Sequence, residues 1–102
     1  MFESRDKPDT DPLVIWLQGG PGCSSQLALF TENGPYMINK NSTAKGNNKL
    51  LYNKYSWNNK ANILFLDQPL GTGFSFTNDL MSLRLNEFGP SQDFYAFLIG
   101  FM

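Results

Sequence analysis

Two short apolar runs, each ended by a turn rich in glycine or proline, set the strongest limit on how this chain can fold. The first run is Leu13–Leu17, and the glycine-rich residues 19–22 stop it. The second run covers residues 61–66 and is ended by Asp-Gln-Pro at residues 67–69. An apolar run without alternation predicts a buried strand that is covered on both faces, as in the parallel sheets of α/β proteins. We expect the two strands to lie in one sheet.

A helical segment is expected after each strand. Ser24 or Ser25 is suited to cap a short helix, which the Asn-Gly-Pro sequence at residues 33–35 would end. A second helix is expected from residues 89–91, Gly-Pro-Ser. Its apolar residues have the spacing i, i+3, i+4 and i+7, and they are Phe94, Phe97, Leu98 and Phe101. The alternation of strand and helix predicts an α/β fold.

Composition excludes several classes of protein. The 102 residues are 41% hydrophobic and 15% aromatic, which is typical of one globular domain. The net charge is -1 and no run of like charge is present, so we predict neither a nucleic-acid nor a membrane partner. The N-terminal residues carry charges where a secretory signal would have its apolar region. Residues 39–55 are rich in asparagine and lysine and are expected to form a surface connection with room for a short hairpin strand.

The chain contains no histidine. A serine nucleophile needs a neighbouring base, and histidine is the commonest one near neutral pH. Ser24 and Ser75 each stand at the serine position of a Gly-x-Ser-x-Gly pattern whose last glycine is missing. These residues therefore predict no Ser-His-Asp triad, and neither serine is expected to be catalytic.

A glycine-rich loop with the sequence Gln-Gly-Gly-Pro-Gly-Cys-Ser-Ser occupies residues 18–25. Such a loop, placed between a strand and a helix, turns several backbone N–H groups toward one point and can bind an anion or an oxyanion. A nucleotide-binding loop is one interpretation, but no lysine follows the last glycine and the spacing is not that of a dinucleotide fingerprint. The other interpretation is the oxyanion-hole loop of an α/β-hydrolase.

The ten residues from Trp16 to Ser25 resemble the serine carboxypeptidase signature Trp-Leu-(Asn/Gln)-Gly-Gly-Pro-Gly-(Cys/Gly)-Ser-Ser. Other segments resemble the same family in the same order, namely residues 2–5, 29–30, 32, 34–36, 55–58, 62–69 and 73–75. Gln18 in place of asparagine, together with residues 71–77, is most similar to the vitellogenic-type branch of the family.

The resemblance implies an α/β-hydrolase fold with a mixed central sheet and flanking helices. Residues 1–102 would form an incomplete, N-terminal part of that domain. In the family the nucleophile lies in a Gly-Glu-Ser-Tyr motif, beyond the helix in which this sequence ends, so the domain is expected to be truncated before the nucleophile elbow. Unpaired strand edges and exposed apolar faces would follow, which predicts poor stability and aggregation.

The resemblance also implies roles for individual residues. Gly20 would donate its backbone N–H to the oxyanion. The N–H of Gly19 and the side chain of Gln18 would bind the terminal carboxylate of a peptide substrate. Glu32 would join this network in its protonated form, and Trp16 is a candidate substrate contact. No metal and no cofactor are implied.

Two further residues, Cys23 and Asn41, match positions of a disulfide and of a glycosylation sequence. The family pairs the cysteine that matches Cys23 with one far downstream, and the 102 residues contain no second cysteine, so a free thiol is expected. Asn41 opens an Asn-Ser-Thr sequence and is a candidate glycosylation site.

The family's activity is removal of C-terminal residues from peptides that have a free carboxylate, in a vacuole, a lysosome or a secretory compartment. A chain without the triad is expected to be inactive by itself. Two alternatives stay open, a non-catalytic peptide-binding remnant and a fragment of a serine carboxypeptidase-like acyltransferase.

Overall fold

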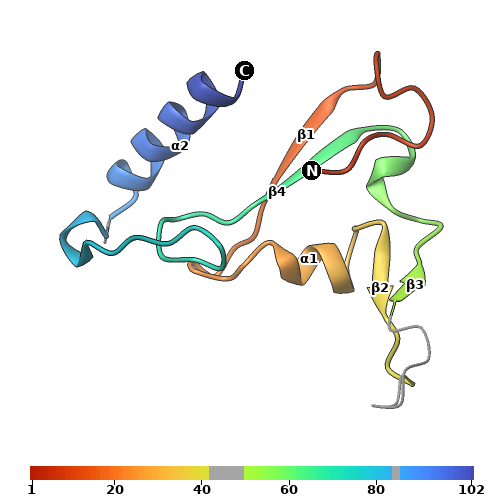
Figure 1. The fold of residues 1–102 in the computed structure, drawn as a ribbon, viewed down its shortest axis with the longest axis horizontal. Coiled ribbons are helices and arrows are strands. Elements are labelled where there is room, and N and C mark those ends of the chain that lie inside the picture. The colour runs from red at the N-terminus through yellow and green to blue at the C-terminus, as the bar shows by residue number, and fades with distance from the viewer. Residues whose placement is uncertain (42–49, 84–85) are drawn as a thin grey trace. The chain divides into compact units, whose positions relative to one another are not determined.

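The computed structural model describes residues 1–41, 50–83 and 86–102. They form two compact units, which we call the first unit (Met1–Trp16 with Gln26–Phe65) and the second unit (Leu17–Ser25 with Leu66–Met102). The elements follow the order β1 (Leu13–Leu17), α1 (Gln26–Thr31), β2 (Tyr36–Ile38), β3 (Leu50–Tyr52), the 3-10 helix η1 (Trp57–Asn59), β4 (Asn62–Leu66), the 3-10 helix η2 (Leu80–Ser82) and α2 (Phe88–Phe101) (Figure 1).

Strands β1 and β4 pair in one sheet, as the two apolar runs predicted. Figure 1 shows the two arrows running in the same direction, so the pair is parallel. The N-terminal segment adds an antiparallel bridge, in which Phe2 and Ile63 exchange two backbone hydrogen bonds of 2.8 Å. Ile63 is fully buried and is the largest side chain of the small core.

The prediction that β1 is a buried strand, covered on both faces, is wrong for the described residues. Leu13 and Leu17 are 42% and 41% exposed, and the three residues between them are half-buried. An apolar sequence shows only that a strand is suited to a covering layer, and the described residues leave part of β1 accessible.

One strand of a hairpin, β3, lies in the predicted surface connection at residues 39–55, and its partner, β2, directly precedes that connection. Strands β2 and β3 pair antiparallel with Tyr36 opposite Tyr52 and Ile38 opposite Leu50, and the two tyrosine rings meet edge to face at 6.3 Å. Helix α1 packs against β2. The helix ends as predicted before Gly34, because three successive N–H groups after it all bond to the carbonyl of Ala28.

Helix α2 confirms the second predicted helix. Its phenylalanines form a stripe in which Phe94 stacks on Phe97 at 6.4 Å and Phe97 stacks on Phe101 at 5.4 Å. Phe94 and Phe97 line a small hollow together with Leu66, the last residue of β4, and Leu70, which lies in the segment after it. The helix is thereby placed against the segment that leaves the strand.

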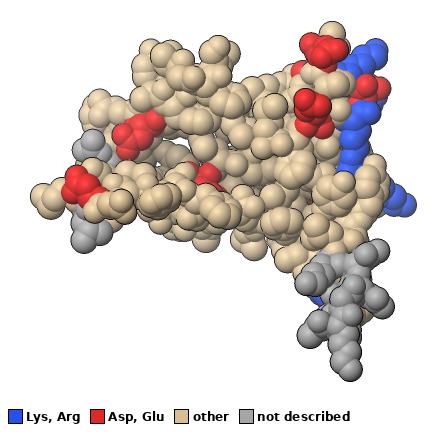
Figure 2. All heavy atoms as spheres, in the orientation of Figure 1, with Lys and Arg blue, Asp and Glu red and all other residues tan. Residues whose placement is uncertain are grey.

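Figure 2 shows basic and acidic side chains side by side in one region of the drawn face, separate acidic side chains elsewhere, and uncharged residues over most of the rest. Lys60 and Asp6 form an ion pair of 2.6 Å on the surface. Neither α1 nor α2, within the described part of the chain, is long and apolar enough to cross a membrane.

Candidate functional site

The glycine loop, residues 18–25, adopts a backbone that needs glycine at two positions. Gly20 has a φ of 129° and Gly22 a φ of 90°, in a region that side chains disfavour. A Cβ atom at Gly20 would also lie 3.0 Å from Cys23 Sγ and 3.1 Å from the Cys23 nitrogen. Glycine is therefore needed at residues 20 and 22 for the backbone conformation of the loop, and not only for flexibility.

The two adjacent N–H groups of Gly19 and Gly20 are the chemically distinctive feature of the loop. Both residues are exposed, and neither N–H donates to any atom of residues 1–41, 50–83 or 86–102. The carbonyl of Gly19 accepts the Cys23 N–H at 3.2 Å, which closes the loop on itself. Two neighbouring donors are thus available to an external oxygen.

Asp67 ties the end of the glycine loop to the segment after β4. Its side chain is only 8% exposed. Oδ1 accepts the Ser24 hydroxyl and the Ser25 N–H, each at 2.7 Å, and Oδ2 accepts the Phe74 N–H at 2.8 Å. Both oxygens are therefore used, on two different segments.

The start of the loop is held by a serine hydroxyl. Ser25 Oγ accepts the Gln18 N–H at 3.2 Å and donates to the carbonyl of Leu66. Gln18 and Ser25, at the two ends of the loop, are thereby joined to each other and to the residue before Asp67. Ser25 is fully buried, which shields these bonds from water.

The ionisation of Asp67 follows from a balance of burial and hydrogen bonding. Burial raises the pKa of this carboxyl, but the Phe74 N–H, the Ser24 hydroxyl and the Ser25 N–H together lower it by more. The net pKa of Asp67 lies below its ordinary value of 3.8. The carboxylate is therefore the stable form over the whole mildly acidic range.

A second glycine turn, residues 71–75, packs against the same carboxylate. The turn is closed by bonds from the Gly71 N–H to the Ser75 carbonyl at 2.6 Å and from the Ser75 N–H to the Thr72 carbonyl at 2.9 Å. A Cβ atom at Gly73 would lie 2.1 Å from Asp67 Oδ2. Only glycine allows the turn to approach this closely.

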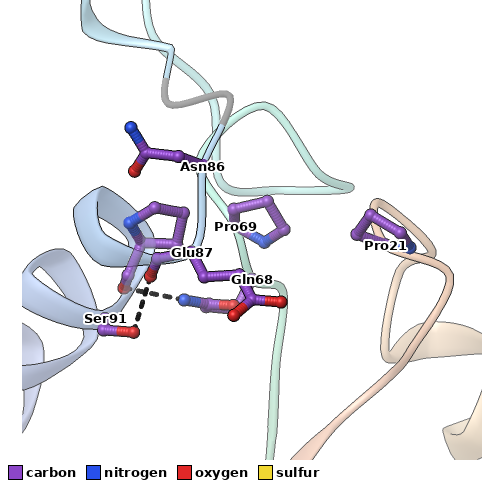
Figure 3. Close-up of a pocket in the computed structure, with 7 residues that line it drawn as sticks. Pro21, Gln68, Pro69, Asn86, Glu87 and Ser91 are labelled. Atoms are coloured by element: carbon purple, nitrogen blue, oxygen red, sulfur yellow. Dashed lines mark hydrogen bonds between the residues drawn. The ribbon is translucent and has the colours of Figure 1, made fainter.

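A pocket of about 560 Å³ adjoins the loop at Pro21 (Figure 3). Its other lining residues come from the segment after β4 and from the start of α2, and they are Gln68, Pro69, Asn86, Glu87, Pro90 and Ser91. Gln68 Nε2 donates to the Pro90 carbonyl at 2.8 Å and connects the two sides. The acidic Glu87 makes this pocket a poor place for a substrate carboxylate.

The structure groups some of the predicted site residues and separates others. Gln18, Gly19, Gly20 and Cys23 belong to the second unit, and Cys23 has a free, exposed thiol. Trp16 and Glu32 belong to the first unit.

The two predicted residues of the first unit differ in their surroundings. The Trp16 ring packs edge to face on Trp57 at 5.2 Å, an interaction between side chains of the protein itself. Glu32 is exposed and follows the end of α1. Asn41 is exposed as well, but the Ser42 and Thr43 of its glycosylation sequence lie outside the described residues.

Sequence reasoning missed Asp67 as part of the site and treated it only as the end of a strand. A signal was present, because the ends of neighbouring parallel strands meet at one edge of a sheet. The glycine loop follows β1, and Asp67 directly follows β4. Among the described residues, no cluster of three or more metal-ligating side chains occurs.

Comparisons with known proteins show the family of this chain. The serine carboxypeptidase family model matches residues 1–102. The chain is 52% identical over 100 residues to serine carboxypeptidase-like 49 of Arabidopsis thaliana, covering 98% of this chain and 18% of that protein. It is 53% identical over 97 residues to serine carboxypeptidase 3 of Hordeum vulgare, covering 95% and 18%. A Dictyostelium discoideum family member is 48% identical over 101 residues, covering 99% and 23%.

A solved structure gives the same result. The crystal structure of a prohormone-processing carboxypeptidase from Saccharomyces cerevisiae superposes with a TM-score of 0.67 at 36% identity, covering 89% of this chain and 19% of that one. The fold is therefore part of an α/β-hydrolase. The chain belongs to the serine carboxypeptidase family and spans about a fifth of the length of these relatives. The vitellogenic-type branch stays a prediction.

Proposed function

We propose that this chain supplies the oxyanion hole and the carboxylate-binding loop of a serine carboxypeptidase. The N–H of Gly20 stabilises the oxyanion that forms on the scissile carbonyl. The N–H of Gly19 and the amide side chain of Gln18 bind the free C-terminal carboxylate of the peptide. The observation that carries the proposal is the pair of exposed glycine N–H groups without an acceptor among the described residues.

Physical chemistry favours this division of roles. Negative charge develops on the carbonyl oxygen in the transition state, and one preorganised donor lowers the barrier by roughly 3 kcal/mol. The substrate carboxylate is already charged in the ground state, so neutral donors bind it without a buried cation of the protein. Adjacent N–H groups on one rigid loop reach both oxygens because the two acceptors are separated by a single residue of substrate.

The hydrolytic step needs groups that these 102 residues do not contain, since they include no histidine. Nucleophile, base and aspartate come, in this proposal, from a part of the enzyme outside residues 1–102, and the chain alone is inactive. The substrates are peptides with a free C-terminus, in line with the prohormone-processing role named for the yeast relative. Glu32 and Trp16 also have roles in substrate binding in this proposal, and the enzyme works in a vacuolar, lysosomal or secretory compartment.

A transplant tests the proposal. Residues 1–102 replace the matching segment of Hordeum vulgare serine carboxypeptidase 3, with which they share 53% identity. The resulting hybrid enzyme should release the C-terminal residue of a peptide acid and act poorly on the matching peptide amide. A hybrid that folds, as judged by circular dichroism, but has no carboxypeptidase activity would contradict the proposal.

Gln18 provides the sharper test within the hybrid. Gln18→Glu has nearly the same shape but places a negative charge beside the substrate carboxylate, so KM for peptide acids should rise at least about tenfold. Gln18→Asn is the matched control, since it keeps the amide and should retain most of the activity. Equal KM values for the Glu and Asn variants would show that Gln18 does not face the carboxylate.

A second candidate function is peptide binding without hydrolysis, because the exposed N–H groups of Gly19 and Gly20 could bind a carboxylate with no catalytic triad. In this case the isolated chain should bind a peptide acid, but not its amide, through Gly19 and Gly20. Amide NMR shifts of these two glycines on titration with the acid, with no product formed, would support it. Shifts of equal size with the amide would rule out carboxylate recognition.

A further inference from the structure

Asp67 is a buried carboxylate held by neutral donors alone. Its donors are the Ser24 hydroxyl, the Ser25 N–H and the Phe74 N–H. The one ion pair among the described residues joins Lys60 and Asp6 in the first unit. No cation of the described residues pairs with Asp67. A buried charge costs several kcal/mol unless its hydrogen bonds are satisfied, so the geometry around this group is demanding.

The two oxygens of Asp67 hold two segments that are far apart in sequence. Oδ1 holds residues 24 and 25, at the end of the glycine loop, and Oδ2 holds the turn that contains Gly73. This turn has a φ of 52° at Gly73, where a Cβ atom would lie 2.1 Å from Oδ2 and 2.7 Å from Ser24 Oγ. The turn therefore packs directly on the carboxylate and limits the positions that it can take.

The restraint reaches the donor glycines through short links. Ser25 joins Gln18 to the carbonyl of Leu66, the residue before Asp67. The Cys23 N–H bonds to the Gly19 carbonyl at 3.2 Å. Gly19 and Gly20 thus lie between two fixed ends of one short loop, and the direction of their N–H groups depends on both ends.

We propose that Asp67 is a positioning residue, which sets the orientation of the Gly19 and Gly20 N–H groups by joining the glycine loop to the second glycine turn. This inference rests on the proposed function of the loop. Asp67 itself touches no reacting atom, and it acts through Ser24, Ser25 and Phe74.

An asparagine side chain should not replace the Asp67 carboxylate. Asparagine has one acceptor oxygen, so Asp67→Asn keeps either the bonds to Ser24 and Ser25 or the bond to Phe74. Its NH2 group would meet an N–H donor on the other side, which separates the two segments. A displacement near 1 Å in a catalytic group lowers rate about 100-fold.

The test uses the hybrid enzyme with Asp67→Asn and the control Asp79→Asn. Asp79 lies in the same unit, but among the described residues its carboxylate accepts bonds only within its own turn, from Met81 and Ser82. Asp67→Asn should lower kcat/KM for a peptide acid about 10- to 100-fold and reduce the preference for the acid over the amide. The control should leave both quantities within about twofold.

The acid-to-amide preference separates positioning from stability. Loss of folded enzyme lowers the rates for both substrates in proportion and leaves their ratio unchanged, whereas a displaced carboxylate-binding loop changes the ratio. An unchanged ratio in Asp67→Asn would overturn the proposal. An unsubstituted hybrid without activity would instead contradict the proposed function, so the two failures are distinguishable.

Ser24→Ala provides a second variant in case Asp67→Asn does not fold. It removes one of the three donors and leaves the charge of Asp67 in place. The same change in preference is expected, at about 3- to 10-fold in kcat/KM. Full activity with an unchanged acid-to-amide preference in this variant would overturn the proposal whatever Asp67→Asn does.

Discussion

Single carboxylates in the two units keep their charge for different reasons. The pKa of Asp11, in the first unit, is lowered by a hydrogen bond from the Ser4 hydroxyl, by the Lys7 N–H and by the charges of Lys60 and Lys7 against a smaller effect of burial. Burial is the largest single effect on the pKa of Asp67 and raises it, but three neutral donors together lower it by more. The Asp67 arrangement is therefore the one that depends on exact hydrogen-bond geometry.

The lowered pKa of Asp67 predicts the pH dependence of stability. The folded-state pKa lies below the unfolded value, near 3.9, so the stabilisation is complete above that value and is lost as pH falls through the folded pKa. The free energy of unfolding should differ between the unsubstituted protein and its Asp67→Asn variant. This difference should be constant from about pH 7 to 5 and should shrink below about pH 4. Urea unfolding followed by circular dichroism gives this difference. A difference that does not change with pH would show that folding does not lower the pKa of Asp67.

Gly73 should tolerate no side chain. Gly73→Ala places a methyl group 2.1 Å from Asp67 Oδ2 at a φ of 52°. The left-handed backbone alone costs about 1 to 2 kcal/mol, so a total loss above about 2 kcal/mol is expected in chemical unfolding. Gly100→Ala is the control, because nothing lies within 4 Å of that position in α2. Alanine there should be neutral or stabilise by up to about 1 kcal/mol. Equal effects at the two positions would contradict the close packing.

Whole elements were predicted from sequence where a local pattern determines them. The run at Leu13–Leu17 gave β1 with its bounds, and the second run gave β4 from Asn62 instead of residue 61. The 3.6-residue spacing of phenylalanines gave α2, and the asparagine-glycine-proline stop gave the end of α1. The burial of β1 was not predictable, since it depends on layers that no local pattern specifies.

The candidate site was predictable in part for the same reason. The glycine loop is contiguous, so its sequence alone indicates a turn that can bind an anion, whereas the roles of Gln18, Gly19 and Gly20 come from the family resemblance and stay proposals. The role of Asp67 depends on Ser24 and Phe74, and the contact to Ser24 spans 43 positions in sequence. Contacts of this kind arise from the pairing of β1 with β4. The two apolar runs indicate which strand ends meet, but they do not specify which side chains bond there.

The β2–β3 hairpin should depend on Arg5. Its guanidinium donates to the Asn53 carbonyl and Asn59 Oδ1, both at 2.8 Å, and to the Pro35 carbonyl at 3.0 Å, and it stacks over the Tyr52 ring at 4.0 Å. Lysine cannot form this planar fork, so Arg5→Lys should destabilise the first unit by roughly 2 kcal/mol.

Tryptophan fluorescence measures the Arg5 effect, since Trp16 and Trp57 both lie in the first unit. Lys60→Ala is the control, because it removes a cation that is 77% exposed, from a surface ion pair. A decrease in stability that is no larger for Arg5→Lys than for this control would contradict the role of Arg5.

At the scale of the whole molecule, the core is small for the length of the chain. Among the described residues, the buried hydrophobic side chains other than proline are Ala28, Leu29, Ala61 and Ile63, and two of these four are alanines. Several large apolar side chains of α2 remain accessible, with Tyr95 and Ile99 both 67% exposed. Relatives that are about five times longer have further chain with which to cover such surfaces. The 102 residues alone are therefore expected to be marginally stable.

The exposed apolar side of α2 predicts self-association of the isolated chain. Contact between copies removes the Tyr95 and Ile99 side chains from water, and roughly 25 cal/mol is gained for each Å² of apolar surface buried. Sedimentation velocity should show a fraction of oligomers that increases between about 10 and 100 μM, the range in which weak association becomes populated. The double variant Tyr95→Lys with Ile99→Lys should shift the chain toward monomer, and Gly100→Ala, on the same helix, should not. A monomer at every concentration, with a cooperative thermal transition, would show that the 102 residues form a self-sufficient domain.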